Sequence, residues 1–150
     1  TYAALRDVAN ELLSMNVIPV IIGGSHELTL PLFEAMKGKL HEIRTTIVDR
    51  KMDYPFSPSD VFDANAFIDR LMNDSCSEDF KLLAYQGYYC PKSILNEVQG
   101  PRCQMVRVGE LFRNIASTEP ILRDTDLLSI DMSAVRHADS QVSPMRFLTD

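Results

Sequence analysis

One histidine and three aspartates of this sequence each lie at or just past the end of a short apolar run. The residues are His26, Asp49, Asp53 and Asp131, and the runs before them span 17–22, 45–48 and 127–130. When an apolar run is a buried strand, the residues that follow it lie at the carboxyl edge of the sheet, where open α/β proteins keep their chemistry. Carboxylates and an imidazole gathered at one edge form a ligand set that suits manganese, zinc or a similar divalent ion.

Taken singly, each of these motifs has a simpler interpretation. A glycine pair after a strand is most often a tight turn, and the histidine that follows is then part of a helix start. Asp49 and Asp53 could belong to a solvated loop, and Asp131 could cap a helix. A nucleotide or phosphate site at Gly23 and Gly24 is a weaker alternative, since neither the GxGxxG nor the GxxxxGK[ST] spacing occurs.

Helical and strand-like patterns alternate along the chain and would position these residues. The expected helices span 1–15, 25–36, 61–72, 91–98 and 110–123, with a further start at 143–150, and the expected strands span 17–22, 44–49, 81–85, 104–108 and 126–131. Pro31 is expected to kink the second helix. The strands show little polar alternation, which is typical of parallel strands covered on both faces. We therefore predict an α/β fold with three αβα layers and a mainly parallel sheet.

Length, charge and cysteine content narrow the class of protein. The 150 residues suffice for one domain with a proper core, which we assign to residues 1–150. The formal net charge of −6 argues against a nucleic-acid or anionic-membrane surface, and no stretch approaches the ~20 apolar residues of a membrane span. Three cysteines without a CxxC pair favour a reducing, cytoplasmic compartment. The chain starts inside a helical pattern, so we expect it to be the central part of a longer protein.

Three segments resemble the metal-binding motifs of a known superfamily. Residues 23–26 (GGSH), 49–53 (DRKMD) and 129–133 (SIDMS) follow the order and rough spacing of GGDHS, DAHxD and SxDxD, the motifs of the ureohydrolases. This superfamily contains arginase, agmatinase and formimidoylglutamase, and segments 87–88 (GY) and 108–111 (VGEL) look most like the formimidoylglutamase-like branch. The resemblance covers most of the chain. It implies an arginase-like fold and a metal-dependent hydrolase that cleaves C–N bonds of linear amidines.

The resemblance implies a complete first metal site and a lost second one. The four positions that hold the first manganese in the family are all present, as His26, Asp49, Asp53 and Asp131. The second manganese needs the histidine of DAHxD and the second aspartate of SxDxD, and these positions are Lys51 and Ser133 here. We therefore expect one Mn²⁺ or another divalent ion, with no metal at all as the alternative. The sequence assigns no catalytic residue.

Lys51 leaves two functions open. Three carboxylates and one lysine balance one divalent ion, so our hypothesis is that the Lys51 ammonium takes the place of the second metal and pairs with Asp49 and Asp131. The alternative is that Lys51 extends into solvent. Ureohydrolases use two ions to activate the attacking water. The chain is therefore either a hydrolase that works with one ion or a catalytically inactive relative that serves binding or assembly.

Arg50, Arg136 and His137 are candidates for contact with substrate, because they lie close to the motifs in sequence. The two arginines could bind an anionic group such as the carboxylate of a glutamate-like ligand, although surface salt bridges are the ordinary use of such residues. His137 could face the site or be a loop histidine. His41 is expected to be an exposed turn residue, and Cys90 a residue of the core or of a shielded loop. The resemblance further implies a small-molecule amidine substrate and a homo-oligomeric full-length protein.

Overall fold

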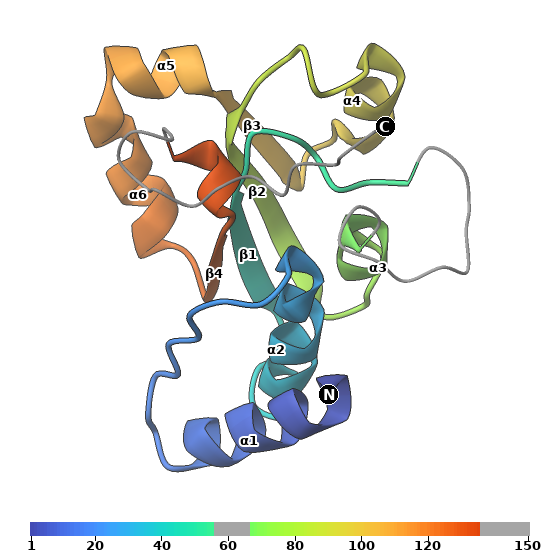
Figure 1. Cartoon of the computed structure of the whole chain (residues 1–150), viewed down its shortest axis with the longest axis vertical. Helices are drawn as coiled ribbons and strands as arrows, with labels where there is room; N and C mark the ends of the chain where they lie inside the picture. The colour runs from blue at the N-terminus through green and yellow to red at the C-terminus, as the bar shows by residue number, and fades with distance from the viewer. Residues whose placement is uncertain (56–66, 136–150) are drawn as a thin grey trace, which may run out of the picture.

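A parallel sheet of four strands runs through the centre of the computed structural model, which describes residues 1–55 and 67–135 (Figure 1). The strands are β1 (Ile43–Val48), β2 (Ser77–Tyr85), β3 (Cys103–Arg107) and β4 (Leu127–Ile130), and their spatial order is β3-β2-β1-β4. The middle strands β1 and β2 are buried along most of their length. Their sequences show little polar alternation because both faces of the sheet are covered.

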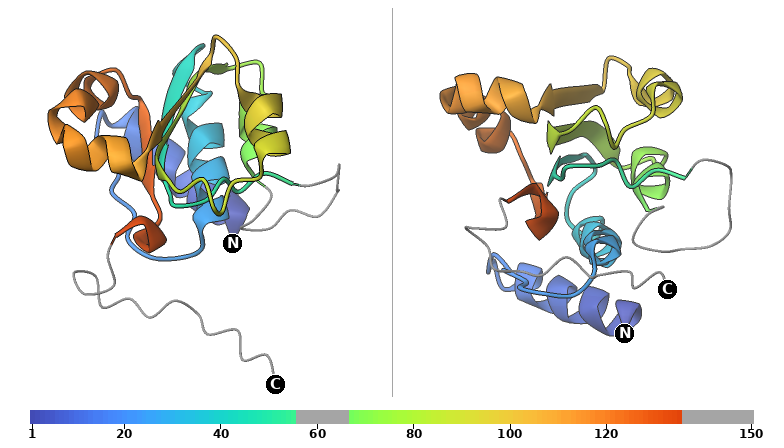
Figure 2. Two further views of the ribbon diagram at one scale, coloured as in Figure 1. Left: turned by 90° about the horizontal axis from the view of Figure 1, so that it is seen from above. Right: turned by 45° about the horizontal axis from the view of Figure 1, so that its top comes forward.

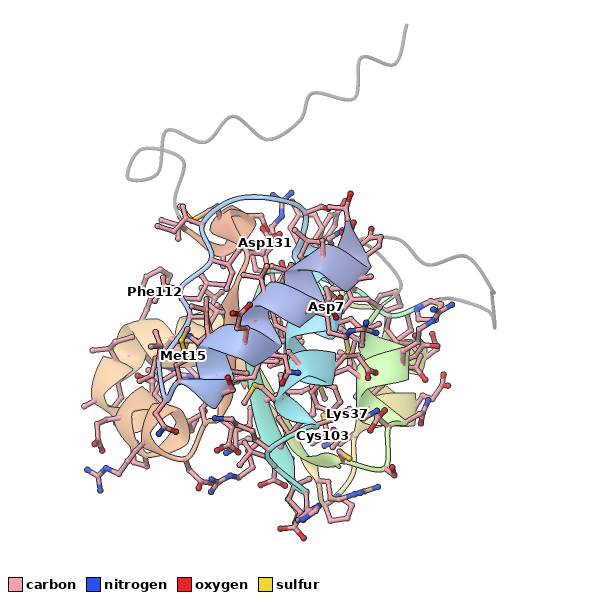
Figure 3. The ribbon with its side chains drawn as sticks, turned by 90° about the horizontal axis from the view of Figure 1, so that it is seen from below. Asp7, Met15, Lys37, Cys103, Phe112 and Asp131 are labelled. Atoms are coloured by element: carbon pink, nitrogen blue, oxygen red, sulfur yellow. The ribbon has the colours of Figure 1, made fainter. Side chains whose placement is uncertain are left out.

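Helices cover the sheet on both faces, so the molecule has three layers (Figure 2). On one face lie α2 (Thr29–Met36), α3 (Ile68–Met72) and α4 (Lys92–Val98), and on the other lie α5 (Val108–Arg113) and α6 (Thr118–Arg123). The first helix, α1 (Tyr2–Ser14), packs against α2 (Figure 3). Three short 3₁₀ turns are η1 (His26–Leu28), η2 (Ile115–Ser117) and η3 (Met132–Ala134). The predicted three-layer α/β fold with a mainly parallel sheet is confirmed.

Two hydrophobic cores hold these layers together. The larger core lies between the sheet and α2, α3 and α4, and its buried members include Phe33 of α2, Ile47 of β1 and Ile94 of α4. The smaller core lies between the sheet and the other helices, where Leu83 of β2 and Ile121 of α6 are buried. Burying a side chain of this size contributes ~1.5–3 kcal/mol. The larger core thus fixes α2, which follows directly on His26, against the sheet.

The predicted strand at residues 17–22 is wrong. Asn16, at the end of α1, has a positive φ of 59°, and the segment that follows it does not join the sheet. Its side chains Ile18, Val20 and Ile22 are 87%, 80% and 94% exposed. A β-branched run forms a strand only when a neighbouring strand supplies hydrogen bonds and side-chain contacts. Within the described residues this run is paired with no strand, and β4, at the edge of the sheet, is bonded only to β1.

Other predicted boundaries differ in smaller ways. The helix predicted at 25–36 divides into η1 and α2, and Pro31 lies in the first turn of α2, where a missing N–H costs no helical hydrogen bond. Strand β2 begins at Ser77, four residues before the predicted start. Residues 56–66 of the predicted loop and helix, the tail at 143–150, and the candidates Arg136 and His137 lie outside the described residues. None of the helices in the described ranges is long and apolar enough to cross a membrane.

Candidate metal centre

The carboxyl ends of β1 and β4 bring two aspartates together. These strands are parallel neighbours, and Val48 is in register with Ile130. Asp49 and Asp131 are the next residues of each strand, and the Asp131 N–H donates to the Val48 carbonyl at 2.9 Å. The Asp131 carboxylate also caps η3, where it accepts from a backbone N–H. Because the pairing of the strands fixes both backbones, the two carboxylates lie side by side at one edge of the sheet.

His26 reaches the same edge from η1, which precedes α2. The Thr29 hydroxyl donates to the His26 carbonyl at 2.8 Å and lies 2.6 Å from the Ser129 hydroxyl of β4. This contact ties η1 to the sheet. The imidazole also makes an edge contact with the ring of Phe67, with 5.0 Å between the ring centroids. His26 therefore joins the site although the run before it is not a strand.

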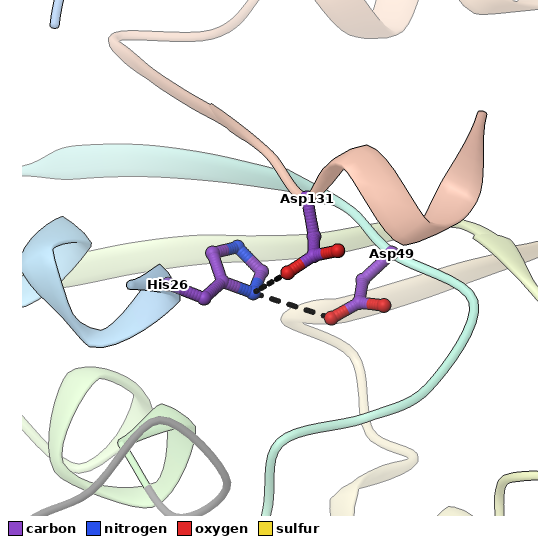
Figure 4. Close-up of side chains that lie close together, drawn as sticks. All are labelled: His26, Asp49 and Asp131. Atoms are coloured by element: carbon purple, nitrogen blue, oxygen red, sulfur yellow. Dashed lines mark ion pairs between the residues drawn. The ribbon is translucent and has the colours of Figure 1, made fainter. Parts of the chain in front are cut away.

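One imidazole nitrogen of His26 faces three carboxylate oxygens, and Figure 4 draws two of these contacts, those with Asp49 and Asp131. Its Nδ1 is 3.2 Å from Asp49 Oδ2, 3.1 Å from Asp53 Oδ2 and 3.7 Å from Asp131 Oδ2. The side chains of His26, Asp49 and Asp53 are 5%, 0% and 2% exposed, and that of Asp131 is 30% exposed. His26, Asp49 and Asp131 each offer a ligand atom within 4.8 Å of the others. The structure thus brings together all four residues that the sequence proposed as one site.

The second oxygen of each aspartate is held by a donor outside this group. Asp49 Oδ1 accepts from the Lys51 N–H and from the Ser133 hydroxyl, both at 3.1 Å. Asp131 Oδ1 accepts from the Ser133 N–H at 2.6 Å, and Asp53 Oδ1 lies 2.9 Å from Lys51 Nζ. The Oδ2 atoms are thereby left to face His26. Donors that fix the outer oxygens in this way orient ligands in metal sites.

The expected ion pair of the Lys51 ammonium with Asp49 and Asp131 is wrong. The main-chain N–H of Lys51 reaches Asp49, but within the described residues the ion pair of its ammonium is with Asp53 rather than with Asp49 and Asp131. The reason lies in Ser133, because the Oδ1 atoms of those two aspartates already accept hydrogen bonds from it. The Lys51 side chain is 36% exposed, so it neither enters the carboxylate group fully nor extends freely into solvent.

Burial and charge perturb the pKa values of this group in opposite directions. Burial alone would lower the pKa of His26, but hydrogen bonds and charges from Asp49 and Asp53 outweigh it and raise that pKa to about 9. Burial also raises the pKa of Asp53, and the neighbouring Asp49 charge adds to the rise. For Asp49 the hydrogen bonds from His26 and Lys51 prevail over burial and hold its pKa below the usual range. Without a metal ion, His26 is therefore protonated at neutral pH.

The residues present fit a divalent ion. The donors are one imidazole nitrogen and three carboxylate oxygens, the combination that suits manganese and similar ions. The group holds three buried or partly buried carboxylates and one lysine, which pairs with Asp53, so it carries excess negative charge unless a proton on His26 or a metal ion offsets it. His26 Nε2 is buried and has no hydrogen-bond partner among the described residues. The fit concerns one ion held by His26, Asp49, Asp53 and Asp131.

Several residues of the site could not be predicted from their sequence positions. Arg50 follows Asp49 at this edge, and its guanidinium stacks over Tyr89, a contact that nothing in the local sequence indicated. Thr29 and Ser129 are one hundred residues apart and meet only because α2 packs on the sheet. Cys90 is buried in the larger core, as predicted, and burial raises the pKa of its thiol.

The fold matches those of solved ureohydrolase structures, although the sequence matches no family model and no curated protein. A formiminoglutamase N114H variant from Trypanosoma cruzi with Mn²⁺ has a TM-score of 0.80 and 20% identity, over 92% of this chain and 49% of that one. Formimidoylglutamase from Bacillus subtilis has a TM-score of 0.80 and 15% identity, over 95% and 48%. Agmatine ureohydrolase from Thermoplasma volcanium has a TM-score of 0.64 and 15% identity, over 86% and 43%.

These matches have a clear structural meaning. The chain has the arginase-like α/β fold, and the resemblance of its motifs to those of the ureohydrolases is confirmed at the level of the fold. The chain spans about half the length of the structures that it matches.

Proposed function

We propose that this chain forms the metal-binding part of a ureohydrolase-like enzyme that hydrolyses a C–N bond of a linear amidine with one divalent ion. The observation that carries the proposal is the arrangement of the aspartate oxygens. Three Oδ2 atoms face Nδ1 of His26, while the Oδ1 atoms are held by Lys51 and Ser133. The proposal includes manganese as the ion, and a cytoplasmic homo-oligomer as the form of the whole protein.

In this proposal each residue of the site has a distinct role. His26, Asp49, Asp53 and Asp131 would hold the ion. Ser133 orients two of the carboxylates through its N–H and hydroxyl, and Lys51 neutralises part of the charge on Asp53. When bound, a divalent ion supplies Lewis acidity, which lowers the pKa of a water molecule and makes it a nucleophile near neutral pH.

We propose one ion rather than two because Lys51 and Ser133 replace the ligands that a second ion would need. The Lys51 ammonium brings a fixed positive charge 2.9 Å from Asp53, where it would repel a second cation. The Ser133 hydroxyl donates to Asp49 and so uses an oxygen that would otherwise be open to another ion.

The test is the Mn²⁺ content per chain after loading and desalting. The wild type should hold one ion, and the double variant Lys51→His/Ser133→Asp should hold two. A matched control makes the same changes on the exposed surface of α4, as Lys92→His/Ser93→Asp, and should still hold one. Hydrolysis of N-formimidoyl-glutamate by the loaded wild type, lost in Asp131→Asn, would support the reaction.

Other metal counts would contradict the proposal in different ways. No ion in the wild type and two in the double variant would indicate the catalytically inactive relative, in which Lys51 replaces a metal altogether. Two ions in the wild type would mean that Lys51 and Ser133 do not stand at the second-metal positions. One ion without turnover of any linear amidine would leave a metal-binding module and remove the hydrolase.

A further inference from the structure

The turn η1, which carries His26, is bonded to the first helix of the chain. The hydroxyl of Tyr2, the first residue of α1, donates to Glu27 Oε1 at 2.9 Å, although the two residues are 25 positions apart. The hydroxyl of Ser25 donates to the same oxygen at 2.6 Å. Glu27 follows His26 directly in η1 and is only 7% exposed. Its carboxylate therefore joins the start of α1 to the turn that presents the imidazole.

The segment that leads into η1 gives this turn little support. Within the described residues the run 17–22 is paired with no strand, so the approach to His26 is not fixed by the sheet. Gly23 and Gly24 follow with φ values of 93° and 89°, a region that glycine enters at little cost. A Cβ on Gly24 would overlap the side chain of Leu28. The position of η1 therefore depends on the contacts that its own side chains make.

Two contacts, from different sides, hold η1 where it is. On the side of the sheet, the Thr29 hydroxyl donates to the His26 carbonyl and meets the Ser129 hydroxyl of β4. On the side of α1, Tyr2 and Ser25 hold the carboxylate of Glu27. A single contact would leave a short turn free to rotate about it, whereas two contacts fix its orientation. The second contact therefore determines the direction in which the imidazole points.

The Tyr2 hydroxyl matters more to this contact than the packing of its ring. Tyr2 is 41% exposed, and a cavity of about 280 Å³ lies beside it between α1 and α2, where Leu30 and Pro31 also line it. This end of α1 is thus loosely packed. The hydrogen bond to Glu27 raises the pKa of the Tyr2 phenol, as expected of a donor held by a carboxylate. Hydrogen bonds to charged groups are stronger than those between neutral groups.

We propose that Tyr2 is a positioning residue for the metal centre. It acts through Glu27 and so fixes the imidazole of His26 against two buried carboxylates. Nδ1 of His26 lies 3.2 Å from Asp49 Oδ2 and 3.1 Å from Asp53 Oδ2, and a small rotation of η1 would lengthen both distances. The apparent affinity for a metal ion falls with the fraction of molecules in which the ligand is misplaced. The inference rests on the proposed function for the ion itself.

The first test compares the Mn²⁺ affinity of Tyr2→Phe with that of the wild type by calorimetry. The variant keeps the ring and removes only the donor, and it should bind Mn²⁺ about tenfold more weakly, as when a group that orients a ligand is lost. The control Thr46→Val removes a buried hydroxyl that lies 2.7 Å from the Thr125 hydroxyl, just before β4. It should lower the stability measured by urea titration and leave the Mn²⁺ affinity unchanged.

Variants of Glu27 test the route from α1 to the imidazole. Glu27→Gln keeps an acceptor for the hydroxyls of Tyr2 and Ser25 and should retain most of the Mn²⁺ affinity. Glu27→Leu removes the acceptor and should weaken binding at least as much as Tyr2→Phe does. The double variant Tyr2→Phe/Glu27→Leu should bind no more weakly than Glu27→Leu alone, because the two residues act through one hydrogen bond.

A second measurement needs no metal ion. The Leu28 N–H donates to the Ser25 carbonyl at 3.1 Å within η1, so its hydrogen exchange in EDTA reports local opening of this turn. Exchange should be several-fold faster in Tyr2→Phe than in the wild type, and unchanged in Thr46→Val.

Two results would overturn the inference. One is an unchanged Mn²⁺ affinity in Tyr2→Phe, and the other is an equal loss of affinity in Thr46→Val, which would mark a general effect of stability. Failure of the proposed function is separate from both. If the wild type holds no Mn²⁺, the proposed function fails, and the exchange of the Leu28 amide alone decides whether Tyr2 positions η1.

Discussion

Binding of Mn²⁺ to this protein should release a proton and should therefore depend steeply on pH. His26 is protonated at neutral pH, because Asp49 and Asp53 raise its pKa to about 9. The nitrogen that carries this proton next to the carboxylates, Nδ1, is the one that a metal ion would need. Ion and proton thus compete for one atom.

The size of the effect follows from the His26 pKa. At pH 7, two units below that pKa, about 1% of the imidazole is neutral, so the apparent affinity should be about 100-fold weaker than at a pH well above 9. This corresponds to about 2.7 kcal/mol. Between pH 6.5 and pH 8 the affinity should rise about tenfold for each unit of pH.

Isothermal titration calorimetry can measure both quantities. Titrations at pH 7 in two buffers of different ionisation enthalpy should give about one proton released for each Mn²⁺ bound. A His41→Gln variant, which removes an exposed histidine outside the site, should release the same number. An affinity that stays flat between pH 6.5 and pH 8, or binding without proton release, would refute the assigned charge state of His26 or its role as a ligand.

Three further changes test the fold and the site. In the metal-free protein the raised His26 pKa should contribute about 3 kcal/mol to the free energy of unfolding. This contribution is fully present below pH 6.5 and is lost as pH rises through about 9. Urea titrations at several pH values should show the loss, and in the His26→Gln variant this pH dependence should be absent. Ser133→Ala should weaken Mn²⁺ binding about tenfold by freeing an oxygen of Asp49, with Ser93→Ala as the unaffected control. Phe33→Ala should lower the free energy of unfolding by ~3–5 kcal/mol because that side chain is fully buried, whereas Ile22→Ser should lower it by no more than ~0.5 kcal/mol. Equal losses of stability in thermal unfolding would contradict the exposure of residues 17–22.

The part of the site that lies on strand ends could be predicted from the sequence. Residues 45–48 and 127–130 are apolar runs that become adjacent parallel strands, and this adjacency is enough to bring Asp49 and Asp131 together. Asp53 follows because it is only four residues further on. These predictions succeed because they depend on local pattern and on one rule of sheet geometry.

Other features depended on contacts that no local pattern reveals. The run 17–22 has the composition of a strand, but composition does not say whether a partner is present to pair with it. The choice of Asp53 as the partner of Lys51 depends on hydrogen bonds that Ser133 makes from the far end of the chain. The stacking of Arg50 on Tyr89 likewise depends on the loop after β2, where the Gln86 N–H donates to the Arg50 carbonyl. Each of these features depends on contacts between residues that are far apart in the sequence.

The unpaired edge of β4 has a consequence for how the protein behaves in solution. Among residues 1–55 and 67–135 the strand is bonded to β1 alone, its Leu128 and Ile130 are exposed, and residues 17–22 present a second apolar run to water. Such edges act as templates for other extended chains. At low ionic strength the net charge of −6 keeps copies apart, but 1 M salt shortens the range of that repulsion to ~3 Å and leaves the apolar surface unchanged. Precipitation of this chain should therefore increase with added salt, and dilute buffer should preserve it.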